Sequence, residues 1–201
     1  MIFLGSFLDD PEYLTGIAAN GNKVVVGALC ILTMGFALTM VPVLLYPIFK
    51  KFNETLALGA VVFRGALEAV VYMAQAILWL LLLSASQNFS VAGSADVPII
   101  QNIGALFIAA DAWTAHILSI VFSLGALMIY WVFYSSKLIP RWLSVWGLVG
   151  GILYLAAPIV GLFDLDWGFL MLPLAVQEMV MALWLIIKGF NPNAIASVSE
   201  R

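Results

Sequence analysis

Five long apolar stretches, separated by short polar turns, are the feature of this sequence that most constrains its fold. Each stretch can cross the hydrocarbon core of a bilayer, which takes about 20 helical residues. Inside a bilayer every backbone N–H and C=O must be paired within the segment, so stretches of this length predict helices. The sequence therefore predicts an all-α fold, a polytopic bundle of transmembrane helices. The expected spans are about 24–49, 55–84, 103–134, 142–163 and 167–187.

Composition excludes a water-soluble fold for this chain. Apolar residues make up 64% of it and charged residues only 9%, whereas about 25% of the residues in soluble domains are charged. A soluble domain of this length would have to expose much of that apolar surface to water. The eight Lys and Arg residues are too few for an extended nucleic-acid-binding surface, so no nucleic acid is expected as a partner.

A short helix is expected at the membrane interface before the first span. The Asp10-Pro11 pair predicts its start and the Asn-Gly-Asn triplet at 20–22 predicts its end. The polar stretch 86–102 is the long internal loop, and the residues from Lys188 onward form a polar tail. Because no change of composition marks a boundary, we predict a single integral-membrane domain over residues 1–201.

The basic residues of the connections indicate an orientation. Lys50 and Lys51 lie in the first turn, Lys137 and Arg141 in the third, and Lys188 ends the last span. With five spans these three sites fall on one side of the membrane. The positive-inside rule places that side and the C-terminus in the cytoplasm, with the N-terminus outside. The expected location is the plasma membrane of a prokaryote.

Ionisable residues inside spans are costly to bury, so each one is a candidate functional residue. Arg64 and Glu68 stand four residues apart on the second span and can meet on one face of a helix. Polar residues continue that face. They predict either a polar seam that lines a substrate or proton path, or an internal ion pair that locks helix packing. The residues that continue the face are Tyr72, Gln75, Trp79 and Ser86.

Three more ionisable residues lie in the third and fifth spans. Asp111 is nearer the outer surface and roughly 140° around the helix from His116, so the two are not expected to pair. His116 suits proton transfer, and a hydrogen-bonded packing role is the alternative. Glu178, Glu68 and His116 are expected at one depth. If their helices face one another, these residues form a central cluster with Arg64 as the counter-charge.

The candidate site can be stated by role. Metal ligands are not expected, because helical zinc sites use at least two histidines with a carboxylate and this chain has one histidine. Neither a metal nor another cofactor is predicted. The candidate catalytic residues are Glu68, Glu178 and His116. The candidate binding residues are Arg64, Tyr72, Gln75, Asp111 and Gln177.

Four segments resemble a bacterial and archaeal multi-pass membrane family known as domain of unknown function 4386. The resemblance spans nearly the whole chain, and it implies that certain charged residues occupy recurring motif positions, whereas position 116 is variable and argues against a catalytic His116. The segments are LLYPIFKKFNETLALGAVVFRGALE (44–68), DAWTAHILSIVFSLGAL (111–127), SSKLIPRWLSVWGLVGG (135–151) and LPLAVQEMVMALWLIIKGF (172–190). The charged positions are Arg64, Glu68, Asp111, Arg141 and Glu178.

The resemblance also implies a helix that this sequence does not contain in full. Members of the family usually have six helices, with both termini in the cytoplasm. Residues Met1–Leu8 look like the last turns of that additional first helix, most of which the chain lacks. The resemblance implies a class and a topology but no established activity.

Two classes of function fit these observations. The first is a non-enzymatic membrane protein, a small transport-like or partner-binding bundle around a polar core. The alternative is an intramembrane enzyme that acts on a lipid or another apolar substrate, with Glu178 or Glu68 as general acid or base and Arg64 holding an anionic group. The lipid bilayer is the expected surrounding partner. A membrane protein or a second copy of the chain is a candidate partner, and no small-molecule ligand is identified.

Overall fold

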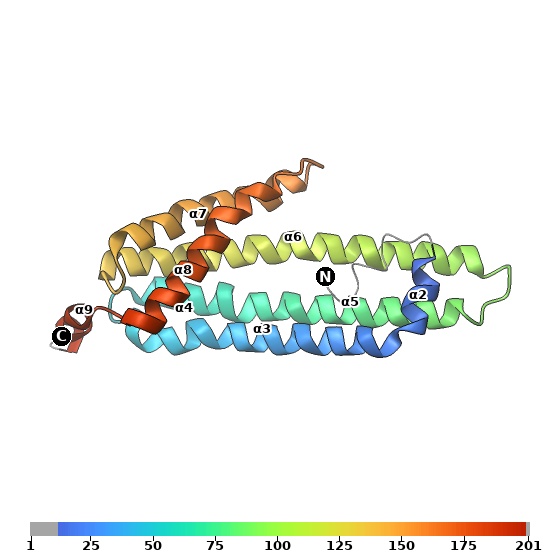
Figure 1. Cartoon of the computed structure of the whole chain (residues 1–201), viewed down its shortest axis with the longest axis horizontal. Helices are drawn as coiled ribbons and strands as arrows, with labels where there is room; N and C mark the ends of the chain where they lie inside the picture. The colour runs from blue at the N-terminus through green and yellow to red at the C-terminus, as the bar shows by residue number, and fades with distance from the viewer. Residues whose placement is uncertain (1–11, 200–201) are drawn as a thin grey trace. The chain divides into compact units, whose positions relative to one another are not determined.

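The computed structural model describes residues 12–199, and every regular element in that range is helical (Figure 1). Five helices of this range are long and apolar enough to cross a membrane. The predicted all-α transmembrane fold is thus confirmed. The expected helix start at Asp10-Pro11 and the expected helix end at Met1–Leu8 lie outside the described residues.

The elements follow the predicted order, with a short helix before the first span. The second span is one continuous helix made of three segments, α4, η1 and α5. The bounds are α2 (Tyr13–Ala19), α3 (Gly21–Phe49), α4 (Glu54–Ala60), η1 (Val61–Leu67), α5 (Glu68–Phe89), α6 (Val97–Ser136), α7 (Arg141–Gly161), η2 (Gly168–Met171), α8 (Leu172–Lys188) and α9 (Pro192–Ser199).

Local chemistry explains where several helices begin. Asn53 has an extended backbone, and its side chain accepts a hydrogen bond from the Leu56 N–H at 2.9 Å, which caps α4. Glu54 in the first turn of α4 suits the positive end of the helix. Pro140 precedes α7, and proline also stands in the first turn of α8, where its missing N–H costs no hydrogen bond.

Two predicted irregular regions are partly helical. The expected loop 86–102 is wrong at both ends, because α5 continues to Phe89 and α6 already begins at Val97. The expected tail after Lys188 contains the helix α9. Polar residues end an apolar stretch without ending a helix, because a helix that projects beyond the hydrocarbon no longer needs apolar side chains.

The chain forms two compact units. Unit 1 comprises Met1–Phe36 and Val70–Ala115, and unit 2 comprises Ala37–Ala69 and His116–Arg201. In unit 1 the short helix α2 buries Leu14 and Ile17 completely against a small apolar cluster. That the whole chain is a single membrane domain stays a prediction.

The core of unit 2 combines aromatic and aliphatic side chains, and it is built where α7 packs closely on its neighbours. Tyr130 is 1% exposed, and its ring lies where a side chain at Gly147 would have to stand. A Cβ at Gly150 would be 3.1 Å from the backbone of Leu174 on α8. These two glycines let α6, α7 and α8 approach closely, and they bring polar groups of the three helices within reach of one another.

Candidate functional site

An ion pair on the second span forms the centre of the candidate site, in unit 2. The Nη1 atom of Arg64 lies 2.5 Å from Oε1 and 2.6 Å from Oε2 of Glu68. The predicted pairing at a spacing of four residues is confirmed. The Glu68 side chain is 2% exposed, so this carboxylate is held inside the protein with both oxygens on one guanidinium nitrogen.

Glu178 of α8 reaches the same arginine. Its Oε1 atom lies 3.8 Å from Nη2 of Arg64, which is an ion pair but longer than a hydrogen bond. The Glu178 side chain is 34% exposed, against 12% for Arg64. One guanidinium is therefore shared unequally by two carboxylates, one buried and tightly bonded, the other half-buried and loosely held.

Arg64 sits within a π-helical turn, the segment η1. In such a turn the N–H groups bond five residues back, and the helix widens by one residue. Turns of this kind occur as short bulges inside α-helices, frequently at functional sites. The hydroxyl of Thr39 on α3 donates to the carbonyl oxygen of Gly65 at 3.3 Å, so the neighbouring helix bonds to the backbone beside Arg64.

Helix α6 closes the other side of the arginine. The guanidinium carbon of Arg64 lies 4.1 Å from the centroid of the Phe122 ring, a cation–π contact. One turn further, a Cβ at Gly125 would lie 2.7 Å from the Arg64 backbone nitrogen. The arginine is therefore surrounded by two carboxylates, by the Phe122 ring and by the backbone of α6 at Gly125.

A second polar set fixes the position of α8. The Tyr130 hydroxyl donates to Oε1 of Gln177 at 2.6 Å, and Nε2 of Gln177 donates to the Leu143 carbonyl at 3.0 Å. Gln177 is fully buried. Both ends of its amide are thus engaged within the protein. Because Gln177 precedes Glu178, these bonds also hold Glu178 in register with Arg64.

His116 lies apart from the Arg64 cluster. It lines a pocket of about 390 Å³ together with Asp164 and Trp167, where α7 ends and η2 begins. A side chain at Gly161 would stand 2.5 Å from its Cε1 atom. His116 precedes Phe122, the residue that stacks on Arg64, by six positions, or about 9 Å along the helix.

The remaining candidates belong to unit 1. The indole Nε1 of Trp79 donates to Oδ1 of Asp111 at 3.1 Å, and Gln75 also reaches this carboxylate. Tyr72 packs against the backbone at Gly35. The structure thus brings Gln75, Trp79 and Asp111 together.

Reasoning from the sequence missed several residues that shape the site. Phe122, Gly125 and Tyr130 stand in a long apolar helix, where an aromatic residue or a glycine carries no functional signal of its own. Their roles depend on which helix faces α6, and periodicity does not encode that choice. Within residues 12–199, His, Cys, Asp and Glu side chains do not gather in a group of three that could hold a metal ion.

Comparison with known proteins gives a family without an activity. No curated protein and no solved structure matches the chain. A family model described as a domain of unknown function does match, and it covers residues 1–189, almost the whole length. The chain is therefore a membrane protein that belongs to the DUF4386 family.

Proposed function

We propose that this protein is a non-enzymatic, transport-like membrane bundle in which Glu178 takes up and releases a proton beside the fixed Arg64–Glu68 pair. The observation that carries the proposal is the unequal sharing of Arg64. Glu68 has both oxygens within 2.6 Å of the guanidinium, whereas Glu178 is 3.8 Å away. Glu68 is the permanent partner, and Glu178 is the group that exchanges.

Charge balance supports this division of roles. One guanidinium and two ionised carboxylates leave one negative charge in excess. An uncompensated charge within a membrane span is costly, and ionisable residues there commonly form proton relays. A proton on Glu178 removes the excess without disturbing the bonds between Arg64 and Glu68. The Glu178 side chain is also less enclosed by the protein, 34% exposed against 2% for Glu68, so a change in its charge disturbs fewer contacts.

The enzyme alternative has less support from the geometry. In that reading Arg64 would hold an anionic group of an apolar substrate, and Glu178 or Glu68 would act as acid or base. Both terminal nitrogens of Arg64 already face carboxylates of the protein. A substrate anion would have to displace Glu68 or Glu178 before it could bind.

Infrared difference spectroscopy on purified protein in lipid nanodiscs tests the proposal. A step in pH should produce a change in the carboxylic-acid C=O band in the wild type and in Glu54→Gln, which alters an exposed carboxylate. One component of this band change should be absent in Glu178→Gln, while the thermal unfolding of this variant stays near that of the wild type. Glu68→Gln should unfold at a lower temperature.

Two results would overturn the proposal. A band change that is identical in the wild type and in Glu178→Gln would place the exchanging proton elsewhere. A loss of thermal stability in Glu178→Gln as large as that in Glu68→Gln would make both carboxylates structural, as part of an ion pair that only locks packing.

We also propose that the basic turns face the cytoplasm of a prokaryotic cell. The support is the distribution of Lys and Arg over the connections. With Cys30 replaced by Ser, a membrane-impermeant thiol reagent should label Ser94→Cys in intact cells and leave Ser135→Cys unlabelled. The reverse pattern would invert the topology.

A further inference from the structure

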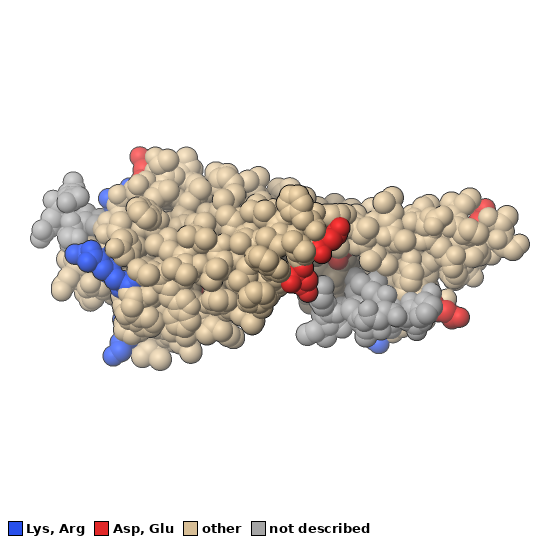
Figure 2. Space-filling model, turned by 90° about the horizontal axis from the view of Figure 1, so that it is seen from above, with Lys and Arg blue, Asp and Glu red and all other residues tan. Residues whose placement is uncertain are grey.

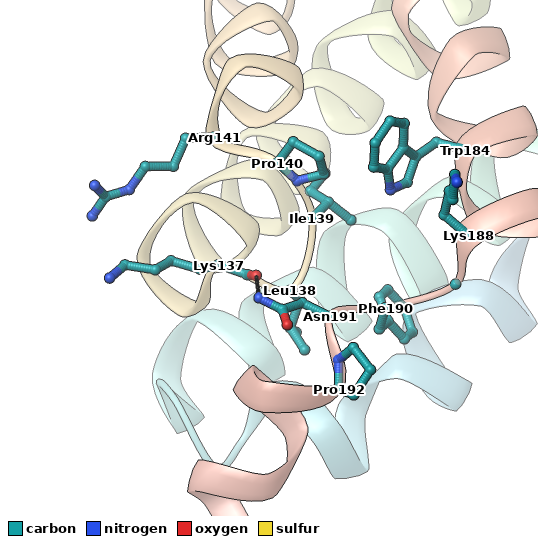
Figure 3. A pocket seen from close by; sticks show the side chains of 11 residues that line it. Lys137, Leu138, Ile139, Pro140, Arg141, Trp184, Lys188, Phe190, Asn191 and Pro192 are labelled. Carbon is teal, nitrogen blue, oxygen red and sulfur yellow. Dashed lines mark hydrogen bonds between the residues drawn. The ribbon is translucent and has the colours of Figure 1, made fainter.

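A pocket of about 490 Å³ lies in unit 2 where α6, α7, α8 and α9 end or begin (Figure 3). Its walls come from the turn between α6 and α7 and from the connection between α8 and α9. In Figure 3 the Lys137 and Arg141 side chains extend away from the pocket on one side, and Trp184 and Lys188 stand on the opposite side. The size falls in the range of pockets that bind small ligands.

The charge of this pocket is positive. Its lining includes three basic residues and no acidic one. In the part of the chain from 12 to 199, no carboxylate oxygen lies within 4.0 Å of the charged groups of these residues. In Figure 2 most of the visible Lys and Arg atoms, in blue, lie close together at the left of the view. Such a cluster attracts an anion. The three residues are Lys137, Arg141 and Lys188.

Hydrogen bonds hold the two walls of the pocket together. The backbone N–H of Asn191 donates to the Leu138 carbonyl at 2.9 Å, and the Asn191 side chain donates to the Lys137 carbonyl at 3.4 Å. Pro140 and Arg141, at the start of the 21-residue helix α7, also line the pocket. The N-terminus of that helix adds a partial positive charge. Hydrogen bonds between the two connections therefore hold in place the backbone that carries the basic side chains.

The backbone at Lys137 gives a second, independent indication. Its φ is 57°, in the left-handed region. Glycine or asparagine usually occupies such a position after a helix, because a Cβ is strained there. A lysine at this position costs stability and contributes a cationic side chain to the pocket. That combination points to a function for the side chain.

The position of the pocket indicates the kind of anion. The α6–α7 turn joins two spans and Lys188 ends another, so the pocket lies at the membrane surface. Trp184 is of a type enriched at the level of lipid headgroups. Next to the pocket, α8 exposes Ile187, which directly precedes Lys188, by 73%. A ligand that carries both a phosphate and acyl chains fits the charge and this apolar face together.

We propose that this pocket binds the phosphate group of an anionic phospholipid, with Lys188 on one side and Lys137 and Arg141 at the opposite rim, and with the acyl chains along α8 at Ile187. Basic pockets between transmembrane helices are a common form of anionic-lipid recognition. The proposal is independent of the proton exchange at Glu178.

Native mass spectrometry of the purified protein with phosphatidylglycerol and with phosphatidylcholine tests the proposal. The wild type should retain phosphatidylglycerol preferentially. Each basic residue near an anionic surface strengthens binding about fivefold. The double variant Lys137→Gln/Arg141→Gln should therefore bind phosphatidylglycerol about 30-fold more weakly, with phosphatidylcholine unaffected. Lys50→Gln/Lys51→Gln is the matched control, because it removes two exposed charges from the neighbouring turn outside the pocket.

Lys137→Gly separates binding from folding. Because glycine suits the left-handed backbone, this variant should unfold at a higher temperature than the wild type without lipid, while it binds phosphatidylglycerol about fivefold more weakly. An equal loss of binding in the Lys50/Lys51 control would reduce the effect to general surface charge and overturn the proposal. Stabilisation of the wild type by inorganic phosphate as strong as that by phosphatidylglycerol would overturn the assignment to a lipid.

Discussion

Replacing Gly125 by alanine tests how closely α6 approaches the backbone of Arg64. The new Cβ would lie 2.7 Å from both the N and Cβ atoms of Arg64 and 3.0 Å from its Cα. These atoms belong to, or are fixed by, the helix backbone and cannot rotate away. Ordinary contact begins at 3.4 Å, so the two helices must separate locally by about 0.7 Å (3.4 − 2.7).

The size of the effect follows from two opposing contributions. Overpacking costs typically about 1–3 kcal/mol, and contact with a rigid backbone places Gly125→Ala at or above the upper end of that range. Alanine in place of glycine within a helix stabilises the helix by about 1 kcal/mol. The free energy of unfolding should therefore fall by about 2 kcal/mol. For a chain of this length, that loss lowers the Tm by about 4–8 °C.

Thermal unfolding in one detergent, followed by tryptophan fluorescence, measures this loss, and Gly65→Ala is its control. Gly65 is next to Arg64, but a Cβ there would meet only Pro42 at 3.5 Å and Thr39 at 3.8 Å, which are ordinary contacts. The Tm of Gly65→Ala should equal or exceed that of the wild type. If Gly125→Ala were as stable as Gly65→Ala, the close approach at Arg64 would be refuted.

Two further substitutions test polar contacts between helices. Tyr130→Phe removes the hydroxyl that donates to Gln177 at 2.6 Å and should cost about 1–3 kcal/mol, because it leaves a buried carbonyl unpaired. The cost should shrink in a Gln177→Leu background, and equal costs in the two backgrounds would mean that the bond is not made. Trp79→Phe removes the donor to Asp111 and should lower the free energy of unfolding by about 1.5–3 kcal/mol, which chemical denaturation can measure. An unchanged midpoint would exclude that bond.

Hydropathy predicted the membrane helices well and their ends less well. The apolar stretches gave the number of long helices and their order, because the hydrocarbon core demands about 20 apolar residues per crossing. Beyond the lipid headgroups a helix is surrounded by water and does not need apolar side chains. Helix α6 therefore continues through Gln101 and Asn102 to Val97, where polar residues had suggested a loop. The π-helical turn at 61–67 left no trace in the composition either.

Only the part of the site that lies within a single helix could be predicted from the sequence. The Arg64–Glu68 pair follows from a spacing of four residues. That Glu178 joins it depends on α8 lying beside η1, which no periodicity within α8 specifies. His116 illustrates the converse. Its predicted depth suggested the central cluster, but the structure places it in a pocket beside the end of α7.

The π-helical turn has a consequence for how the length of this chain can vary. A π turn holds one residue more than an α turn, so a deletion of one residue within 61–67 can be absorbed by conversion to α-helix. Both flanking segments, α4 and α5, would then keep their present faces towards their neighbours. Arg64, at the centre of the segment, is among the residues whose side chains would change direction. Single-residue deletions in relatives should thus gather in this turn, and each should alter the arginine's partners rather than the fold.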